Sequence, residues 1–333
     1  MEVVESTADL KAKIDKIIKR AEFVAIDTEF VREKSYYANL GLIQIGYEDE
    51  DFVVDPVSDN IDIMPLEKLF DNENIVKVLH ACGQDLEIFY NYFGRLPKNV
   101  FDTQVAAKLL GFGEAISYGN LVHDYMDIRL DKSARYTDWM KRPLDNEQIR
   151  YALDDVVYLK QIYPQIINDL NDKKRLNWAL EECQKLLDEN IYFIDPDECW
   201  QKLKIKSQDK KYLALLKSLA RWREIQAQNQ NKPRNWILKD DAIQEIASLK
   251  PKKEKDLKNL RFYRFDDRNA AEILGVVDYA INEETPPKIK RKKYSSDSIT
   301  PLVALLRIVL KNQSLIHDIA PSVIADADDL KMI

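Results

Sequence analysis

The sequence predicts an α/β domain followed by an all-helical region. Three short apolar runs lie close together near the N-terminus, at 23–26, 40–47 and 52–55, and polar linkers separate them. Strand patterns then alternate with helical patterns, and from about residue 171 onward no convincing strand pattern occurs. This order of elements is typical of a mixed five-stranded α/β sheet with flanking helices.

Each element of the α/β part has a local cause. The runs IVKVLHA (75–81) and NVFD (99–102) predict the fourth and fifth strands. Ser6 or Thr7 is expected to cap the first helix, since their hydroxyls accept hydrogen bonds from free N–H groups of a first turn. Helical spacing of apolar residues and terminal Pro, Asp or Gly residues predict helices over 7–20, 65–70, 84–94, 102–111, 118–126 and 145–168.

The chain is expected to divide into a large domain and smaller helical parts. Pro233 and Pro251 separate short helical patterns in the second half, and a polar connector that contains prolines follows at 283–298. The last segment of the chain is too short to bury much surface alone. It is therefore expected to be a partial helical unit that is docked on its neighbour or cut short. The expected parts are a domain over 1–170, a linking helix over 171–205, a helical domain over 206–285 and a partial helical segment over 294–333.

Charge is distributed unevenly along the chain. The net charge is −7, yet residues 201–262 hold 17 Lys and Arg against 7 Asp and Glu, a local net charge of +10. The other residues therefore carry a net charge of −17. A basic segment of this kind attracts polyanions, although a merely solvated basic face is the alternative.

Several classes of protein are not favoured. The sequence contains no apolar run long enough to cross a membrane, and its N-terminus lacks the order of a signal peptide, so a cytoplasmic protein with no membrane partner is expected. Its three cysteines form no CxxC pair, which argues against a disulfide framework or a zinc ribbon. Walker A, HExxH and GxSxG patterns are absent.

Carboxylates mark the ends of the predicted elements. Asp27 and Glu29 end the first strand and point to the same side of it, where their repulsion is unfavourable unless a cation lies between them. Asp85 follows the fourth strand, where a role as a first-turn acid is the alternative to catalysis. Asp155 shares a helix face with Tyr151, four residues earlier. Oxygen ligands suit Mg²⁺ and Mn²⁺, and two such ions about 4 Å apart form a clamp for displacement at phosphorus.

Three segments resemble the motifs of the DEDD 3′→5′ exonucleases, in the subgroup with a tyrosine in the third motif. They are FVAIDTEF, VLHACGQDLEIF and YALDDVVYL. The stretches LIQIG, VFDTQVAAKLLG and TDWMKRPLDNEQIRYA further resemble the ribonuclease D family, over roughly residues 5–170. The basic region 206–285 is similar to the helical HRDC domain, of which that family often carries two. The resemblance implies a ribonuclease H-like sheet followed by an HRDC-like helical region.

The resemblance also implies roles for individual residues. Asp27, Glu29 and Asp155 would bind a first divalent metal ion, Asp27 would bridge to a second, and Asp85 would support the second. Tyr151 would orient the attacking water, because a phenol with a pKa near 10 is a poor base at neutral pH. The YxxxD spacing selects Asp155 rather than its neighbour Asp154. Two other polar side chains are expected to be structural: Asp102 as a helix cap and His80 as a core or supporting residue.

Contacts to RNA are predicted from basic residues outside the acidic motifs. Lys217 and Arg221 are four residues apart and share a helix face, opposite a core-facing stripe of apolar residues. Arg142 is expected to contact a phosphate or, alternatively, to pair with an acid. Trp222 and Trp236 are expected in a core rather than as stacking platforms for bases.

The function implied is that of a metal-dependent 3′→5′ exoribonuclease that uses two Mg²⁺ or Mn²⁺ ions and releases nucleoside 5′-monophosphates. Its expected partner is RNA, notably tRNA precursors with 3′ extensions, and no obligate protein partner is implied. Two alternatives remain open: a DNA 3′→5′ exonuclease of the proofreading or Werner type, and a noncatalytic RNA-binding module.

Overall fold

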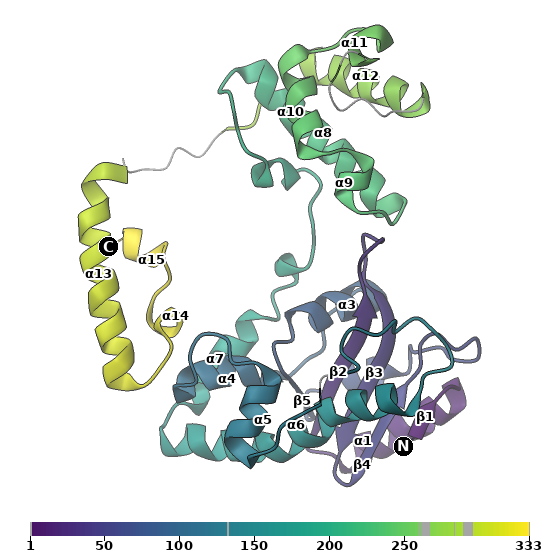
Figure 1. Cartoon of the computed structure of the whole chain (residues 1–333), viewed down its shortest axis with the longest axis vertical. Coiled ribbons are helices and arrows are strands. Elements are labelled where there is room, and N and C mark those ends of the chain that lie inside the picture. The colour runs from purple at the N-terminus through teal and green to yellow at the C-terminus, as the bar shows by residue number, and fades with distance from the viewer. Residues whose placement is uncertain are drawn as a thin grey trace. The chain divides into compact units, whose positions relative to one another are not determined.

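The computed structural model describes residues 2–131, 133–258, 260, 267–282, 284–288 and 296–332. The chain forms two compact units, which are drawn in Figure 1. The first consists of Met1–Val31, Asn39–Tyr192 and Lys292–Ile333. The second consists of Arg32–Ala38 and Phe193–Arg291. The predicted boundary near residue 294 lies outside the described residues.

A mixed sheet organises the first unit (Figure 1), and its strand order is β1-β4-β3-β2-β5-β6. Strands β2, β3 and β4 are antiparallel neighbours, whereas β5 and β6 run parallel to β2. The strands are β1 (Glu2–Val4), β2 (Phe23–Val31), β3 (Asn39–Tyr47), β4 (Glu50–Val54), β5 (Val76–Leu79) and β6 (Val100–Asp102). The five predicted strands are present. The sheet has one strand more than predicted, namely β1, which pairs with β4 at the edge. This strand was missed because its three residues are too few to form a recognisable pattern.

The helices of the α/β part begin and end close to the predicted residues. Ser6 rather than Thr7 is the first N-cap, since its hydroxyl accepts a hydrogen bond from the N–H of Asp9. The longest helix, α6, carries a capping box in which Asp145 and Gln148 satisfy each other's N–H groups. The helices are α1 (Thr7–Arg20), α2 (Leu66–Phe70), α3 (Gly83–Phe93), α4 (Thr103–Leu110), α5 (Tyr118–Met126), α6 (Asn146–Asp172) and α7 (Leu176–Lys185).

One face of the sheet is covered by α6. Val156 and Leu159 of this helix share a buried cluster with Ala25 of β2 and Val78 of β5. A side chain in place of Gly46 of β3 would lie only 3.2 Å from the Cβ of Val156, so the helix approaches the strand closely. Because residues two apart on a strand point to the same side, Asp27 and Glu29 share the face of Ala25 and point toward α6.

The second unit is helical and has its own core. Its α-helices within the described residues are α8 (Lys210–Asn229), α9 (Arg234–Ile237), α10 (Asp240–Leu249), α11 (Glu254–Lys258) and α12 (Asp267–Asn282). The predicted apolar stripe of α8 is buried, and Trp222 packs against the same core. The expectation for Trp236 is wrong, because its side chain is 61% exposed on the short helix α9.

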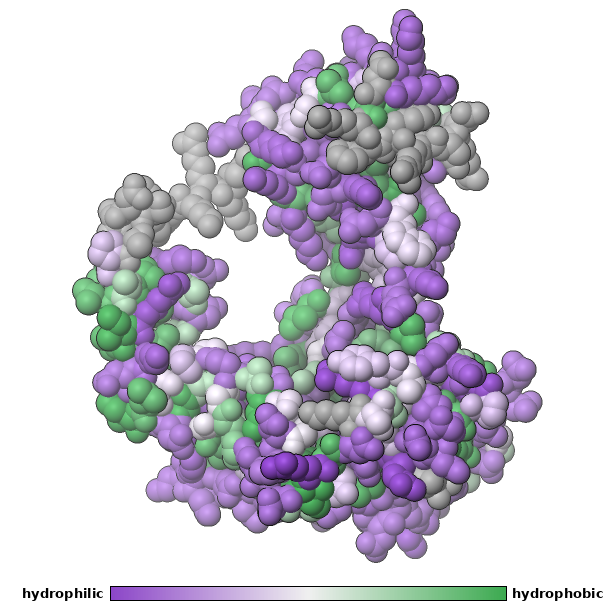
Figure 2. Space-filling view, in the orientation of Figure 1, coloured by the Kyte–Doolittle hydropathy of each residue, from purple (hydrophilic) through white to green (hydrophobic). Residues whose placement is uncertain are grey.

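The C-terminal segment forms α13 (Ser296–His317), α14 (Pro321–Ile324) and α15 (Asp329–Met332). It belongs to the first unit and contacts the α/β part. The N–H of Ala320 donates to the carbonyl of Lys108 at 2.7 Å, and the Arg175 guanidinium donates to the Asp318 carbonyl at 3.0 Å. Leu305 and Ile308 of α13 are more than 60% exposed, and they belong to the apolar surface seen over this segment in Figure 2. No helix within the described ranges combines the length and the apolar character that a membrane span requires.

Candidate active site

Strand β2 presents two carboxylates to α6. Asp27 lies opposite Gln44 of β3, and Glu29 lies opposite Leu42. The register of the two strands shifts immediately after Glu29, where a β-bulge interrupts the ladder. The ladder is regular from Asp27 to Glu29, so the two side chains point to the same side of the sheet, and the bulge begins only beyond them.

Asp155 of α6 joins the two acids of β2. One carboxylate oxygen from each of Asp27, Glu29 and Asp155 lies within 4.8 Å of the other two. All three side chains are partly exposed, so the group can be reached from solvent. Three hard oxygen ligands at this separation suit a divalent cation such as Mg²⁺ or Mn²⁺. The neighbouring Asp154 is not part of this group, which agrees with the predicted YxxxD register.

Asp85 reaches the site from the first turn of α3. It is only 6% exposed, and it accepts a hydrogen bond from the hydroxyl of Thr28, the residue between the two acids of β2. It is not one of the three residues that share a ligand distance of 4.8 Å, but its charge raises the pKa of Asp27, Glu29 and Asp155. Asp85 is therefore a first-turn acid of a helix and a neighbour of the cluster at the same time.

The pKa values of the four acids are raised, because it is unfavourable for all four carboxylates to be ionised together without a cation. Burial, followed by repulsion from Asp155, raises the pKa of Glu29 to about 8. Burial is also the main reason that the pKa of Asp85 and that of Asp155 rise to about 7, and that the pKa of Asp27 lies well above its usual range. Divalent cations would replace the protons that these groups otherwise retain, so the donor set fits metal ions.

Tyr151 lies in the wall of a cavity of about 190 Å³ beside the cluster, together with Asp155 and Arg135. Its ring lies 6.1 Å from the ring of Trp139, and the residue is partly buried. Burial and then the charge of Asp155 raise the pKa of Tyr151, so the phenol stays protonated at neutral pH. It can donate a hydrogen bond to a bound water, but it cannot act as a base there.

Three further residues at the site were not predicted. Thr28 holds Asp85, and the hydroxyl of Tyr118 in the cavity wall donates to the carbonyl of Asp154 at 2.9 Å. The charge of Arg135 lowers the pKa of Glu29 and of Asp155. Thr28 could have been noticed inside the DTE motif, whereas no local pattern marks Tyr118 or Arg135.

The predicted structural roles of two polar residues are confirmed. Asp102 caps α4 by accepting from the N–H groups of Gln104 and Val105, and it also accepts from Ala81 and Cys82. His80 contacts the hydroxyl of Thr103 and the carbonyl of Ile116, each at 3.0 Å. Both residues therefore hold together the loops that follow β5 and β6.

The three basic residues predicted to contact RNA form ion pairs in the structure. Arg142 makes a two-pronged pair with Asp55 at 2.5 Å and donates to the Gly41 carbonyl, which is the second of its two predicted alternatives. Lys217 lies 3.1 Å from Glu284, and Arg221 lies 2.9 Å from Asp197. Arg142 thus has a structural role, while RNA contacts of Lys217 and Arg221 stay a prediction.

Comparison with known proteins identifies the family. A model described as 3′-5′ exonuclease matches residues 1–171, and an HRDC domain model matches residues 212–277. Ribonuclease D of Sphingobium indicum is 41% identical over 320 residues, which cover 94% of this chain and 82% of that protein. The chain belongs to the ribonuclease D family.

Other members of the ribonuclease D family show the same extent of similarity. Ribonuclease D of Zymomonas mobilis is 38% identical over 338 residues, covering 99% of this chain and 86% of that protein. The crystal structure of Escherichia coli RNase D, an exoribonuclease involved in structured RNA processing, superposes with a TM-score of 0.88 at 26% identity. That match covers 99% of this chain and 88% of the other, so the α/β domain and the helical region are both features of the family fold.

Proposed function

We propose that this ribonuclease D family member shortens RNA from its 3′ end by hydrolysis at two divalent cations, Mg²⁺ or Mn²⁺, and that tRNA precursors are among its substrates. Membership of the family makes the protein a 3′→5′ exoribonuclease. The observation that carries the finer proposal is the grouping of Asp27, Glu29 and Asp155, from a strand and a distant helix, within 4.8 Å.

The acids have separate roles in this proposal. Asp27, Glu29 and Asp155 would hold one cation, and Asp27 and Asp85 would hold the other. Bound cations would supply the positive charge that activates a water molecule and stabilises the leaving oxygen. The Thr28 hydroxyl orients the Asp85 carboxylate, and Tyr151, which stays protonated, orients the water by a hydrogen bond. Arg135 contributes a positive charge near Glu29 and Asp155, where a negatively charged scissile phosphate would enter.

The domain arrangement is part of the same proposal. Residues 1–170 would form the exonuclease domain and 206–285 an HRDC-like domain that holds the RNA body. The predicted linking helix over 171–205 is too long, because the α-helix within this linker, α7, spans only Leu176–Lys185. Residues 294–333 would form part of a second HRDC-like domain. The local net charge of +10 over residues 201–262 supports a role in binding a polyanion.

The direct test is trimming of a 5′-labelled tRNA that bears a short 3′ trailer. With Mg²⁺ or Mn²⁺ we expect a ladder of products that shorten one nucleotide at a time and release nucleoside 5′-monophosphates, and we expect EDTA to stop the reaction. A 2′-deoxy strand of the same sequence serves as the control for sugar preference, because only RNA offers 2′-hydroxyl groups.

Three outcomes would contradict the proposal in different ways. Faster trimming of the deoxy strand would identify a DNA exonuclease. Binding of RNA without any shortening would identify a noncatalytic RNA-binding module. Undiminished trimming in EDTA would exclude the divalent cations.

A further inference from the structure

The segment that connects β2 to β3 is held by the helical unit. The side-chain oxygen of Asn231 accepts hydrogen bonds from the N–H groups of Tyr36 and Tyr37, at 3.1 and 3.0 Å. The hydroxyl of Tyr36 donates to Glu224 of α8. The guanidinium of Arg234 lies over the Tyr36 ring, 4.7 Å from its centre. Residues 32–38 are therefore one wall of a structured site in the second unit.

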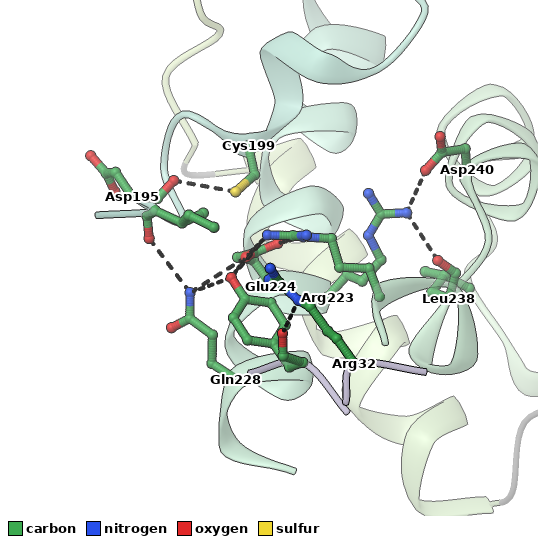
Figure 3. A network of polar contacts seen from close by, with 11 residues as sticks. Arg32, Asp195, Cys199, Arg223, Glu224, Gln228, Leu238 and Asp240 are labelled. Atoms are coloured by element: carbon green, nitrogen blue, oxygen red, sulfur yellow. Dashed lines mark hydrogen bonds and ion pairs between the residues drawn. The ribbon is translucent and has the colours of Figure 1, made fainter. Parts of the chain in front are cut away.

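An arginine balances the charge of the acid in the middle of this network. Glu224 is completely buried, and Arg234 pairs with both of its carboxylate oxygens, at 2.5 and 2.7 Å. Burial alone would raise the pKa of Glu224, but hydrogen bonds from Arg234 and Tyr36 hold it below its usual value. Glu224 therefore stays ionised and is paired with Arg234. Figure 3 shows Glu224 within this network of polar contacts.

Next to this network lies a cavity of about 460 Å³, and more positive than negative side chains line its wall. The cations in its wall are Arg32, Lys202, Arg223 and Arg234, and the acids are Glu33, Glu224 and Asp240. Glu224 pairs with Arg234, and Asp240 pairs with Arg223 at 2.5 Å. Four cations against three acids give the wall a net charge of +1. A cavity of this sign attracts an anion.

Arg223 has an unused donor in this wall. Its side chain is only 6% exposed, and burying a charged group is unfavourable unless its donors are satisfied. Its Nη1 donates to the Leu238 carbonyl at 3.0 Å and to Asp240, as Figure 3 shows, but its Nε has no partner. An unsatisfied guanidinium in the wall adds positive charge that protein acceptors do not fully use, and this favours an anion in the adjacent cavity.

Lys202 contributes a positive charge that is accessible to solvent. It is exposed at the end of the short 3-10 helix Cys199–Lys202, and within the described part of the chain it forms no ion pair. A lysine of this kind binds phosphate as a point charge, whereas the arginines can supply directed hydrogen bonds. Arg32 lies on the opposite segment, where its Nε donates to the carbonyl of Tyr36 at 3.1 Å.

We propose that this cavity binds a phosphate group of the RNA backbone, between the connecting segment 32–38 and the start of the helical domain. The proposal rests on the proposed function in one respect only, namely that RNA is the substrate. Contacts to phosphate read no sequence, so the site strengthens binding of any RNA strand and makes it dependent on salt.

The test is equilibrium binding of a fluorescein-labelled oligoadenylate to the full chain in EDTA, over a series of KCl concentrations. For Lys202→Ala we expect an affinity about threefold lower and a slope of log K against log[KCl] that is smaller by about 0.7, the value for one lost contact to a single strand. Lys202→Arg should restore both. The control is Lys204→Ala, which removes the same charge two residues away at an exposed position outside the cavity wall.

Arg32→Ala provides a second, independent variant on the other wall, and it should lower the affinity and the slope in the same way. Circular dichroism checks that both variants are folded. Equal affinity and slope for wild type, Lys202→Ala and Arg32→Ala would overturn the site, as would equal losses for Lys202→Ala and Lys204→Ala. Because binding is measured without metal, these results do not depend on catalysis. A wild-type protein that binds RNA but does not trim it would instead remove the proposed reaction.

Discussion

Asp155→Asn is expected to lower the rate of RNA 3′ trimming at least ~10²-fold, the scale of loss seen when a charge-stabilising group is removed from an active site. The asparagine keeps the shape of the side chain but removes a carboxylate from the three whose oxygens lie within 4.8 Å. The cation at that position would lose a charged ligand, and its affinity would fall. Single-turnover trimming of the labelled tRNA at saturating Mg²⁺ measures the effect on the chemical step.

Asp154→Asn is the matched control, because it makes the same change one residue earlier on α6. Asp154 lies outside the three-residue cluster, so its replacement should leave the rate within a few-fold of wild type. A rate for Asp155→Asn equal to that of the Asp154 control would show that the carboxylates are wrongly assigned.

The stability of the metal-free protein is expected to fall as the pH rises from about 6.5 to about 8. Glu29, Asp85 and Asp155 have folded-state pKa values of about 8, 7 and 7, all above the values near 4 that an unfolded chain would show. The folded state therefore holds protons that the unfolded state has lost, and this stabilisation disappears as the pH passes through the folded-state values. Thermal unfolding in EDTA at several pH values measures the trend.

The pH window is chosen so that other groups do not obscure this trend. Burial lowers the pKa of His80, which reduces stability only as the pH falls below about 6.5. Burial also lowers the pKa of Lys77 to about 8, so its opposite effect on stability begins only near the upper end of the window. Two controls isolate the carboxylates: Asp155→Asn should make the decline shallower, and Mg²⁺ should raise the melting temperature more at about pH 8 than at about pH 6.5. A melting temperature that is constant across this pH range in EDTA would contradict the predicted link between protonation of the carboxylates and stability.

The sequence was sufficient to predict the acids and the elements that carry them. The run before Asp27 reads as a buried strand, and the apolar neighbours of Asp155 determine which side of α6 faces the sheet. The alternation of strand residues then places Asp27 and Glu29 on one side without any knowledge of tertiary structure. These signals are local, which is why the α/β architecture and the YxxxD register agree with the structure.

Other features depend on partners that are distant in the sequence. The pairing of Arg142 with Asp55 joins residues 87 positions apart, and the hydrogen bond from Thr28 to Asp85 joins residues 57 apart. In the sequence Tyr36 lies between two neighbouring strands, β2 and β3, yet it forms hydrogen bonds with Glu224 and Arg234, which are about 190 positions away. No periodicity or motif marks such pairs, so only the folded chain reveals the cavity that they line.

Folding is expected to gather Asp27, Glu29, Asp85 and Asp155 into one site for two divalent cations. Crystals of the full chain grown with Mn²⁺ and measured at the manganese absorption edge test it directly, because anomalous scattering locates the ions independently of any assumed role. We expect two manganese peaks, one bound by Asp27, Glu29 and Asp155 and the other by Asp27 with Asp85 beside it. Ordered crystals at saturating Mn²⁺ with no manganese at these four residues would contradict it.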